Sequence, residues 1–261
     1  MRALNIAATG MDAQQSRVEV ISNNLANMST TAYQPRRAEF TDLHYQQAAR
    51  PGTITSADGT ELPTGVQLGL GVRLASVTMD QEQGSLQQTG GTYDLALEGN
   101  GFFEVTLPDG RAGFTRDGAL KRSGEGQIVT SDGLPLAPDI VIPADAADVS
   151  INADGEVYAY FRDQVQPQLL GQITLATFTN PQGLEALGGN LYVETPASGG
   201  PVIGAPGLEG RGSIRQGYLE SSAVDAVREM TDLIEAQRGY ELNSKVITAA
   251  DQMLSATVQM R

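Results

Sequence analysis

The C-terminal stretch of the chain places the strongest constraint on its fold. This stretch, Glu220–Arg261, contains no proline, and its single glycine, Gly239, weakens a helix by about 1 kcal/mol relative to alanine. Ser221 or Ser222 can cap the start of a helix, and Asp225 places negative charge near the positive end of the helix dipole. The stretch therefore predicts one long helix.

Apolar residues on this helix form two rows. The first recurs at every seventh position, as a coiled-coil seam requires. It consists of Ala226, Leu233, Tyr240, Ile247 and Leu254. The second lies about 140° round the helix at 100° per residue. It consists of Leu242, Val246, Ala249, Met253, Ala256 and Met260. Because a surface helix of a monomer needs one apolar face, two rows predict two different neighbours. The alternative is a helix buried inside one domain, where the polar residues between the rows would need water or partners.

The N-terminus carries a matching pattern. Large apolar residues recur every seven positions, at Leu4, Met11, Val18 and Leu25. Further apolar residues follow three of them at the companion seam positions, at Ala7, Ile21 and Met28. We expect this helix to pair with the first row of the C-terminal helix. The pairing residues would be Leu4, Met11, Val18, Ile21 and Leu25 against Leu233, Tyr240, Ile247 and Leu254. The second row would remain free to face another molecule.

The predicted fold class is α+β, with long N- and C-terminal helices paired as a coiled coil, an inserted mainly-β domain and an extended arm. Residues 1–33 and 220–261 would form the discontinuous helical domain, and residues 34–72 the arm or connector. The arm prediction depends on turn-forming residues, with Asp58-Gly59 as a hairpin-turn signal. A loop of this length in a compact domain is usually functional.

Residues 73–219 would form the β-rich outer domain. Short apolar runs alternate there with Asp-Gly turn signals, which is typical of a sandwich or small barrel. The runs are Leu74–Met79, Leu95–Leu97, Phe102–Leu107, Gln127–Thr130, Ile140–Ile142, Val157–Phe161, Ile173–Phe178 and Leu191–Val193.

Charge and composition exclude several classes of function. The net charge of −14 argues against binding to nucleic acid or to an anionic membrane surface. No apolar run approaches the roughly 20 residues that a membrane-spanning helix needs. With no cysteine and a single histidine, His44, the chain lacks the residues for disulfides, thiol chemistry or a zinc site. The N-terminus has no apolar core of a cleavable signal, so export would be expected to use a route that does not read one.

Three patterns suggest chemistry, and none supports an enzyme. Gly99–Gly101 is half of a phosphate-loop signature, but it lies between two predicted strands and lacks the Lys-Ser/Thr pair. Asn152–Gly155 resembles the middle of a calcium loop without its spaced acids, so a β-turn is expected. Glu104 and Asp117 could perform acid/base work, but nothing in the sequence brings them together. We therefore predict no catalytic residue, no cofactor and no metal.

Segments along nearly the whole chain resemble bacterial flagellar rod and hook proteins. In the N-terminal helix these segments are Ala3–Gln15, Ile21–Asn27 and Thr31–Tyr33. Near the C-terminus they are Gly217–Ser222, Glu229–Met230, Leu233–Ile234, Ala236–Glu241 and Asn243–Lys245. In the β region they are Gly99–Phe103, Phe114–Gly118 and Asn190–Thr195. The chain departs from the residues that are usual in the family at Gln34, Ala223 and Gly239. Of these, Gly239 affects only the expected stiffness of the last helix.

Within this family, the stretch from Gln46 to Arg73 resembles a long segment that marks the distal rod members. The residues that would form this stiffening arm are Arg50, Pro51, Gly52, Leu62, Pro63, Gly65, Gly69 and Gly71. A proximal rod or hook subunit is the alternative within the family, and the arm argues against both. A cell-wall-acting module is the alternative from a different class, and the sequence offers no catalytic pair for it.

The resemblance implies a structural subunit of the flagellar distal rod. Such a subunit would self-assemble into a straight helical tube that transmits motor torque to the hook and encloses the export channel. The implied partners are further copies of itself, proximal rod proteins, the hook protein or hook–rod junction, the peptidoglycan and outer-membrane ring proteins, and the flagellar export apparatus. The implied location is the basal body in the periplasm. We predict that the second row, Leu242 to Met260, is the seam between subunits.

Overall fold

The computed structural model describes residues 2–49, 64–162, 164 and 166–259. Some predicted site residues lie outside this part of the chain, namely Arg50, Pro51, Gly52, Leu62, Pro63 and Met260. The side chain of Leu254 also lies outside the described residues. For these residues the assignments stay predictions.

The chain forms two compact units. The first, called here the helical unit, comprises Met1–Ala26, Arg36–Thr78 and Asp225–Arg261. The second, called here the β unit, comprises Asn27–Pro35 and Met79–Val224. The domain boundaries inferred from the sequence stay a prediction.

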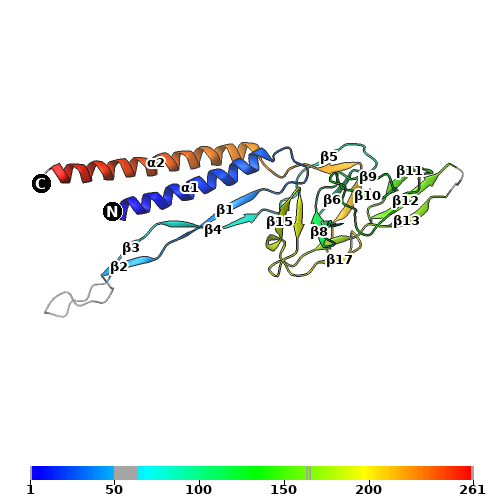
Figure 1. The fold of residues 1–261 in the computed structure, drawn as a ribbon, viewed down its shortest axis with the longest axis horizontal. Helices are drawn as coiled ribbons and strands as arrows, with labels where there is room; N and C mark the ends of the chain where they lie inside the picture. The colour runs from blue at the N-terminus through cyan, green and yellow to red at the C-terminus, as the bar shows by residue number, and fades with distance from the viewer. Residues whose placement is uncertain (1, 50–63, 163, 165, 260–261) are drawn as a thin grey trace. The chain divides into compact units, whose positions relative to one another are not determined.

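Two helices of the helical unit lie side by side (Figure 1). They are α1 (Arg2–Ala26) and α2 (Ala226–Gln259). Arg17 on α1 pairs with Asp232 on α2, whereas Gly10, earlier in α1, faces Asn243, later in α2. The two helices are therefore antiparallel.

Helix α2 begins later than the sequence pattern predicts. The Oδ1 atom of Asp225 accepts hydrogen bonds from the amides of Val227 at 3.0 Å and Arg228 at 3.3 Å, so Asp225 is the cap. The expectation that Ser221 or Ser222 caps this helix is wrong. The chain just before them is held in a strand of the β unit, β19 (Tyr218–Glu220), which delays the start of the helix.

A two-stranded ribbon belongs to the helical unit as well. Its first part pairs β1 (Arg36–Asp42) with β4 (Val72–Met79), and its second part pairs β2 (Tyr45–Ala49) with β3 (Val66–Gly69). The second pair is antiparallel, and its register places Tyr45 opposite Gly69. The ribbon thus runs out along β1 and β2 and returns along β3 and β4.

The predicted fold class, an α+β chain organised by a terminal coiled coil, is wrong. The described residues form two α-helices and nineteen strands, so strands dominate this part of the chain. A coiled-coil seam of large apolar residues is not shown. The buried positions of the two helices are Ala7, Ala13, Ile21, Asn24, Ala236 and Ala250. Most of these side chains are small or polar, whereas knobs-into-holes packing needs large apolar side chains along the seam.

The β unit contains several sheets. The largest has six strands in the order β15-β16-β8-β7-β14-β17. These strands are β7 (Phe102–Thr106), β8 (Ala112–Thr115), β14 (Leu175–Thr177), β15 (Glu185–Gly188), β16 (Leu191–Val193) and β17 (Val202–Gly204). A three-stranded sheet contains, in order, β11 (Ala146–Ile151), β12 (Glu156–Phe161) and β13 (Gln168–Gln172). Antiparallel pairs join β18 (Ser213–Gln216) to β6 (Leu95–Glu98), β19 to β5 (Leu86–Gln88), and β10 (Ile128–Val129) to β9 (Lys121–Arg122).

The core of the β unit gathers side chains from different sheets. Phe103 and Val105 of β7 pack with Leu97 of β6 and Val157 of β12, and all four are inaccessible to solvent. A smaller cluster joins Phe102, Phe114, Ala176 and Phe178, in which the phenylalanine rings meet edge to face. Consecutive side chains of one strand are buried on its two faces, as Phe102 is in the smaller cluster and Phe103 in the larger, which explains why the sequence shows short continuous apolar runs.

Candidate assembly surface

Polar groups join α1 to α2. Asn24 is 1% exposed, and its Nδ2 atom donates to Glu229 Oε1 at 3.1 Å and to the Arg36 carbonyl at 2.8 Å. Arg17 Nη2 lies 2.8 Å from Asp232 Oδ1. Burial raises the pKa of Glu229, and the hydrogen bond from Asn24 acts in the opposite direction.

Glycines permit a close approach at two points of the same contact. A Cβ atom at Gly10 would lie 2.9 Å from Nδ2 of Asn243, and one at Gly239 would lie 3.1 Å from Cδ of Gln14. A side chain at either position would push its polar neighbour away. Gly239 therefore has a packing role that outweighs its low helix propensity.

The residues predicted to pair the helices lie beside this contact. Ile21 is buried, and Tyr240 is 45% exposed. The others with described side chains are half-buried, namely Leu4, Met11, Val18, Leu25, Leu233 and Ile247. On α2, this row is about 60° round the helix from the buried Ala236 and Ala250. The role of these residues in holding the pair stays a prediction.

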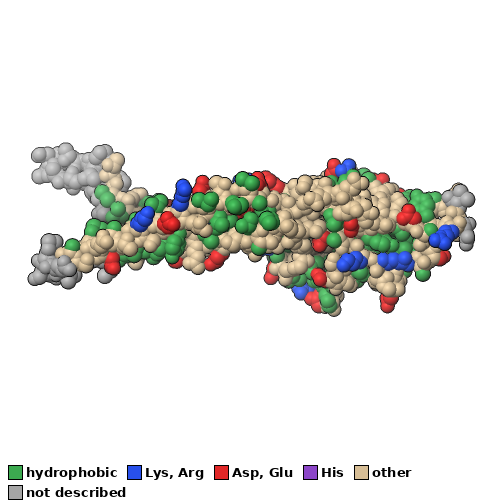
Figure 2. All heavy atoms as spheres, turned by 90° about the horizontal axis from the view of Figure 1, so that it is seen from above, with side chains coloured by type: hydrophobic (Ala, Val, Ile, Leu, Met, Phe, Trp, Pro, Cys, Tyr) green, Lys and Arg blue, Asp and Glu red, His purple; other side chains and the backbone are tan. Residues whose placement is uncertain are grey.

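The second apolar row of α2 is exposed. Leu242 is 62% exposed, Val246 48% and Met253 65%, and Ala249 and Ala256 are exposed as well. Figure 2 shows hydrophobic side chains spread over the surface of the helical unit. An apolar row of this kind along one helix face is typical of a protein–protein contact.

Helix α2 also exposes a further group of apolar side chains near its start, centred about 90° round the helix from the second row. Val227 is 75% exposed, Met230 54% and Ile234 50%. Their spacing of three and four residues is itself a helical signal. Sequence reasoning missed them because Gln237 and Glu241, the next residues on the same face of the helix, are polar.

The described part of the ribbon also exposes apolar side chains. Tyr45 is 56% exposed, Val66 48%, Leu68 45% and Leu70 40%. Gly65, Gly69 and Gly71, which belong to the predicted stiffening arm, are half-buried.

Gly71 marks a close approach of the ribbon to α1. Its φ is +119°, and a Cβ atom there would overlap the hydroxyl of Thr9. The same hydroxyl accepts a hydrogen bond from the amide of Val72 at 3.4 Å. The ribbon is thus attached to α1 at the point where β4 begins.

The chemical patterns of the sequence have structural explanations. Asn152 Oδ1 accepts hydrogen bonds from the amides of Asp154 at 3.1 Å and Glu156 at 2.8 Å, as in the expected β-turn. Asp117 Oδ1 accepts a bond from the amide of Ala119 at 3.0 Å and so serves a turn. Burial raises the pKa of Glu104. Over the described ranges no group of three His, Cys, Asp or Glu side chains is placed to hold a metal ion.

Comparisons with known proteins agree along the chain. "Flagella basal body rod protein" matches residues 4–34, "Flagellar hook protein FlgE/F/G D1 domain" residues 96–159, and "Flagellar basal body rod FlgEFG protein C-terminal" residues 215–260. The flagellar basal-body rod protein FlgG of Caulobacter vibrioides is 51% identical over 261 residues, covering 100% of both chains. The chain belongs to the flagellar basal-body rod protein family.

Further relatives support this membership. The flagellar basal-body rod protein FlgG of Agrobacterium fabrum is 49% identical, covering 98% of this chain and 97% of its own. A solved hook protein, FlgE2 of Helicobacter pylori, is 18% identical over 72% of this chain and 43% of its own, with a TM-score of 0.25 that supports no argument.

As a member of the rod protein family, this chain is a structural subunit of the flagellar basal-body rod and is located in the flagellar basal body. In the part of the chain that the structure describes, neither helix is long and apolar enough to cross a bilayer.

A buried ion pair in the β unit of this rod protein connects three of the segments that resemble the family. Arg116 Nε lies 3.1 Å from Glu220 Oε2, with side-chain exposures of 7% and 2%. The other guanidinium nitrogens of Arg116 donate to the carbonyls of Gly101 at 3.3 Å and Gly99 at 3.1 Å. Glu220 Oε1 accepts a further bond from the amide of Gly84 at 3.0 Å. These distant segments therefore meet around one charge pair, with its polar atoms largely satisfied.

Proposed function

We propose that this rod protein polymerises through the exposed row of α2 into the straight helical tube of the distal rod. This tube would transmit motor torque to the hook and enclose the export channel. The single observation that supports the proposal is the exposed apolar row along α2, from Leu242, 62% exposed, to Met253, 65% exposed.

The size of the row matters for the energetics. Fully burying one such side chain contributes on the order of 1.5–3 kcal/mol. Immobilising a subunit costs roughly 4–15 kcal/mol. One side chain cannot offset this cost, and two reach only its lower end, so the contact needs much of the row. We therefore propose that the adjoining exposed residues Val227, Met230 and Ile234 contribute together with the predicted seam residues Leu242, Val246, Ala249, Met253, Ala256 and Met260.

The two faces of α2 differ, and this difference suits a helical polymer. One face contacts α1 through small and polar residues, and another exposes apolar ones. An apolar row that packs on a different surface of the next copy makes a heterologous contact, and such contacts generate open helical assemblies unless their rotation closes.

The specific partners belong to this proposal. They are further copies of the chain, proximal rod proteins, the hook protein or hook–rod junction, the peptidoglycan and outer-membrane ring proteins, and the export apparatus. Because the family is structural, we propose no catalytic role.

Polymerisation of the purified chain tests the proposal. We expect the full chain to sediment as tubes that are visible by electron microscopy. A chain that ends at Val224, and so lacks α2, should keep its β unit and remain unassembled. A full chain that stays monomeric at every concentration tested, or a truncated chain that assembles equally well, would contradict the proposal.

Deleting Gln46–Leu70 is expected to permit assembly but to produce a curved or bendable tube. The deletion removes β3 and all of β2 except Tyr45. It therefore removes the exposed side chains of Val66 and Leu68, which we propose contact a neighbouring subunit. The measurement is tube curvature in electron micrographs. The double variant Val66→Ser/Leu68→Ser keeps the ribbon length and should show a smaller effect in the same direction. A straight tube from the deletion would remove the ribbon from the account of stiffness.

A further inference from the structure

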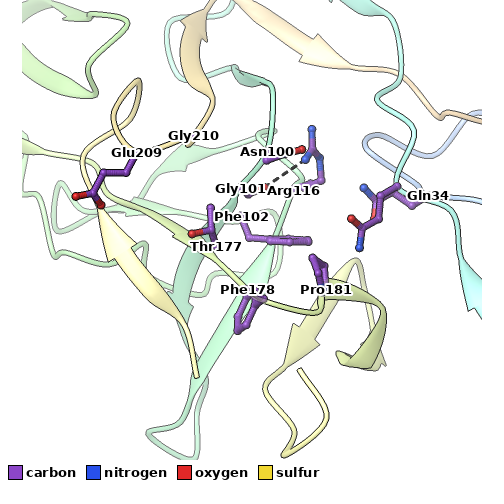
Figure 3. Close-up of a pocket in the computed structure, with 11 residues that line it drawn as sticks. Gln34, Asn100, Gly101, Phe102, Arg116, Thr177, Phe178, Pro181, Glu209 and Gly210 are labelled. Atoms are coloured by element: carbon purple, nitrogen blue, oxygen red, sulfur yellow. Dashed lines mark hydrogen bonds between the residues drawn. The ribbon is translucent and has the colours of Figure 1, made fainter. Parts of the chain in front are cut away.

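The β unit contains a pocket of about 330 Å³ that the assembly surface does not use. Its wall combines the buried rings of Phe102 and Phe178 with Pro181, and its rim includes the exposed residues Asn100 and Glu209 (Figure 3). We call it the Gln34 pocket.

Gln34 is the unusual member of this wall. It is 3% exposed, and its Oε1 atom is buried without a hydrogen-bond partner in the described chain. Gln34 lines the pocket together with Phe102 and Pro181 (Figure 3). A buried carbonyl oxygen without a donor is costly, which points to a ligand that supplies the donor.

A hydrogen-bond donor remains available on the same wall. Arg116 is 6% exposed and donates through Nε to Glu220, through Nη1 to Gly101 and through Nη2 to Gly99. A guanidinium has five N–H groups, so within the described chain one N–H on each terminal nitrogen is left over. The pocket therefore offers both an acceptor, Gln34, and donors, on Arg116.

The charged side chains around the pocket are already paired with other side chains. Arg116 pairs with Glu220 at 3.1 Å, and Glu209 pairs with Arg211 at 2.8 Å. Neither a cation nor an anion would find an unpaired countercharge. A neutral group that both donates and accepts hydrogen bonds fits best, and an amide is such a group.

The burial of the two phenylalanine rings argues against a sugar as the occupant. Phe102 is 4% exposed and Phe178 9% exposed, and their rings meet edge to face at 6.0 Å between centroids. No open ring face is presented for stacking. The rings instead form an apolar wall beside the few polar groups that would orient an occupant.

We propose that the Gln34 pocket receives an amide group, from an Asn or Gln side chain or a backbone peptide, of a second copy of this chain. The N–H of the amide donates to Gln34 Oε1, and its carbonyl accepts from Arg116. This inference rests on the proposed polymerisation, which would supply the second copy.

The first test is Gln34→Leu, which keeps the approximate size of the side chain and removes the acceptor. The unfolding temperature of the monomer should not fall, because the variant also removes a buried unpaired carbonyl. The concentration needed for polymerisation should rise about five- to tenfold, as expected for the loss of one hydrogen bond. Unchanged polymerisation would overturn the inference.

Asn100→Trp provides a second variant at an exposed position, so it tests the pocket even if Gln34→Leu folds poorly. The indole fills the mouth of the pocket and should weaken polymerisation, whereas the matched control Asn100→Ala leaves the mouth open and should assemble like the unaltered chain. Equal assembly of the two variants would contradict the proposal.

Small probes establish the chemistry on the monomeric full chain. N-methylacetamide should shift the side-chain NMR signals of Gln34 more than acetate or methylammonium at the same concentration. A stronger response to either charged probe, or tight binding of a cell-wall glycan fragment, would overturn the assignment. If the unaltered chain does not polymerise, the proposed function fails. If it does and both pocket variants assemble normally, only this inference fails.

Discussion

Replacing Glu220 by alanine is expected to unfold the β unit under conditions where the unaltered chain is folded. The change leaves the guanidinium of Arg116, 6% exposed, without its countercharge, and the Gly84 amide without its acceptor. Breaking a buried ion pair in this way costs roughly 3–5 kcal/mol. The free energy of unfolding of a typical domain is roughly 5–15 kcal/mol, so this loss is a large part of it. Denaturant unfolding followed by circular dichroism measures the loss.

Two further variants show that the buried pair is responsible. Asp109→Ala removes an ion pair with Arg111 whose side chains are 48% and 64% exposed, and it should change stability little. The double variant Arg116→Met/Glu220→Leu removes both charges and should lose less stability than Glu220→Ala alone. If the double variant is no more stable than the single one, the unpaired guanidinium is not the cause.

Replacing Met253 by aspartate is expected to abolish polymerisation while the β unit stays folded. Met253 is 65% exposed on the second apolar row of α2. A carboxylate there would be desolvated in the subunit contact, which is unfavourable without a partner. Sedimentation measures assembly, and circular dichroism measures folding.

The matched control for this prediction is Ser255→Asp. Ser255 is exposed and only two residues further along, but it lies about 200° round the helix, away from the row. It should assemble normally, whereas Leu242→Asp, on the row, should behave like Met253→Asp. Tubes that form from Met253→Asp at the normal rate would show that this row is not the seam.

Much of the secondary structure could be predicted because local patterns decide it. The N-terminal helix, predicted from the apolar pattern that runs from Leu4 to Met28, is α1, Arg2–Ala26, and the long C-terminal helix is α2. Most of the apolar runs of the β region coincide with strands, such as Val157–Phe161 in β12. Ile140–Ile142 is an exception, because it lies outside any named strand: Ile140 and Ile142 enter the core, whereas Val141 is exposed. Strands β13 and β15 were missed because they are exposed sheet edges without an apolar pattern.

The arrangement of these elements could not be predicted in the same way. The prediction of a coiled coil was wrong because Ala236, Ala250 and Gly239 let α1 approach closely. A pattern of large apolar residues does not reveal a contact made by small ones. Arg116 and Glu220 are 104 positions apart, so no local sequence pattern predicts their pairing. The exposure of Leu242 and Met253 agrees with the expectation that one face of α2 is left over, although its role as a seam stays a prediction.

The small side chains between α1 and α2 have a mechanical consequence. Alanine presents one methyl group and glycine none, so at these positions drawing the two helices apart brings less apolar area into water than leucines would. A pair joined in this way resists a steady pull much less than a seam of leucines would. Such a chain would unravel from its ends under modest force, which would suit the proposed contact of the subunit with the export apparatus.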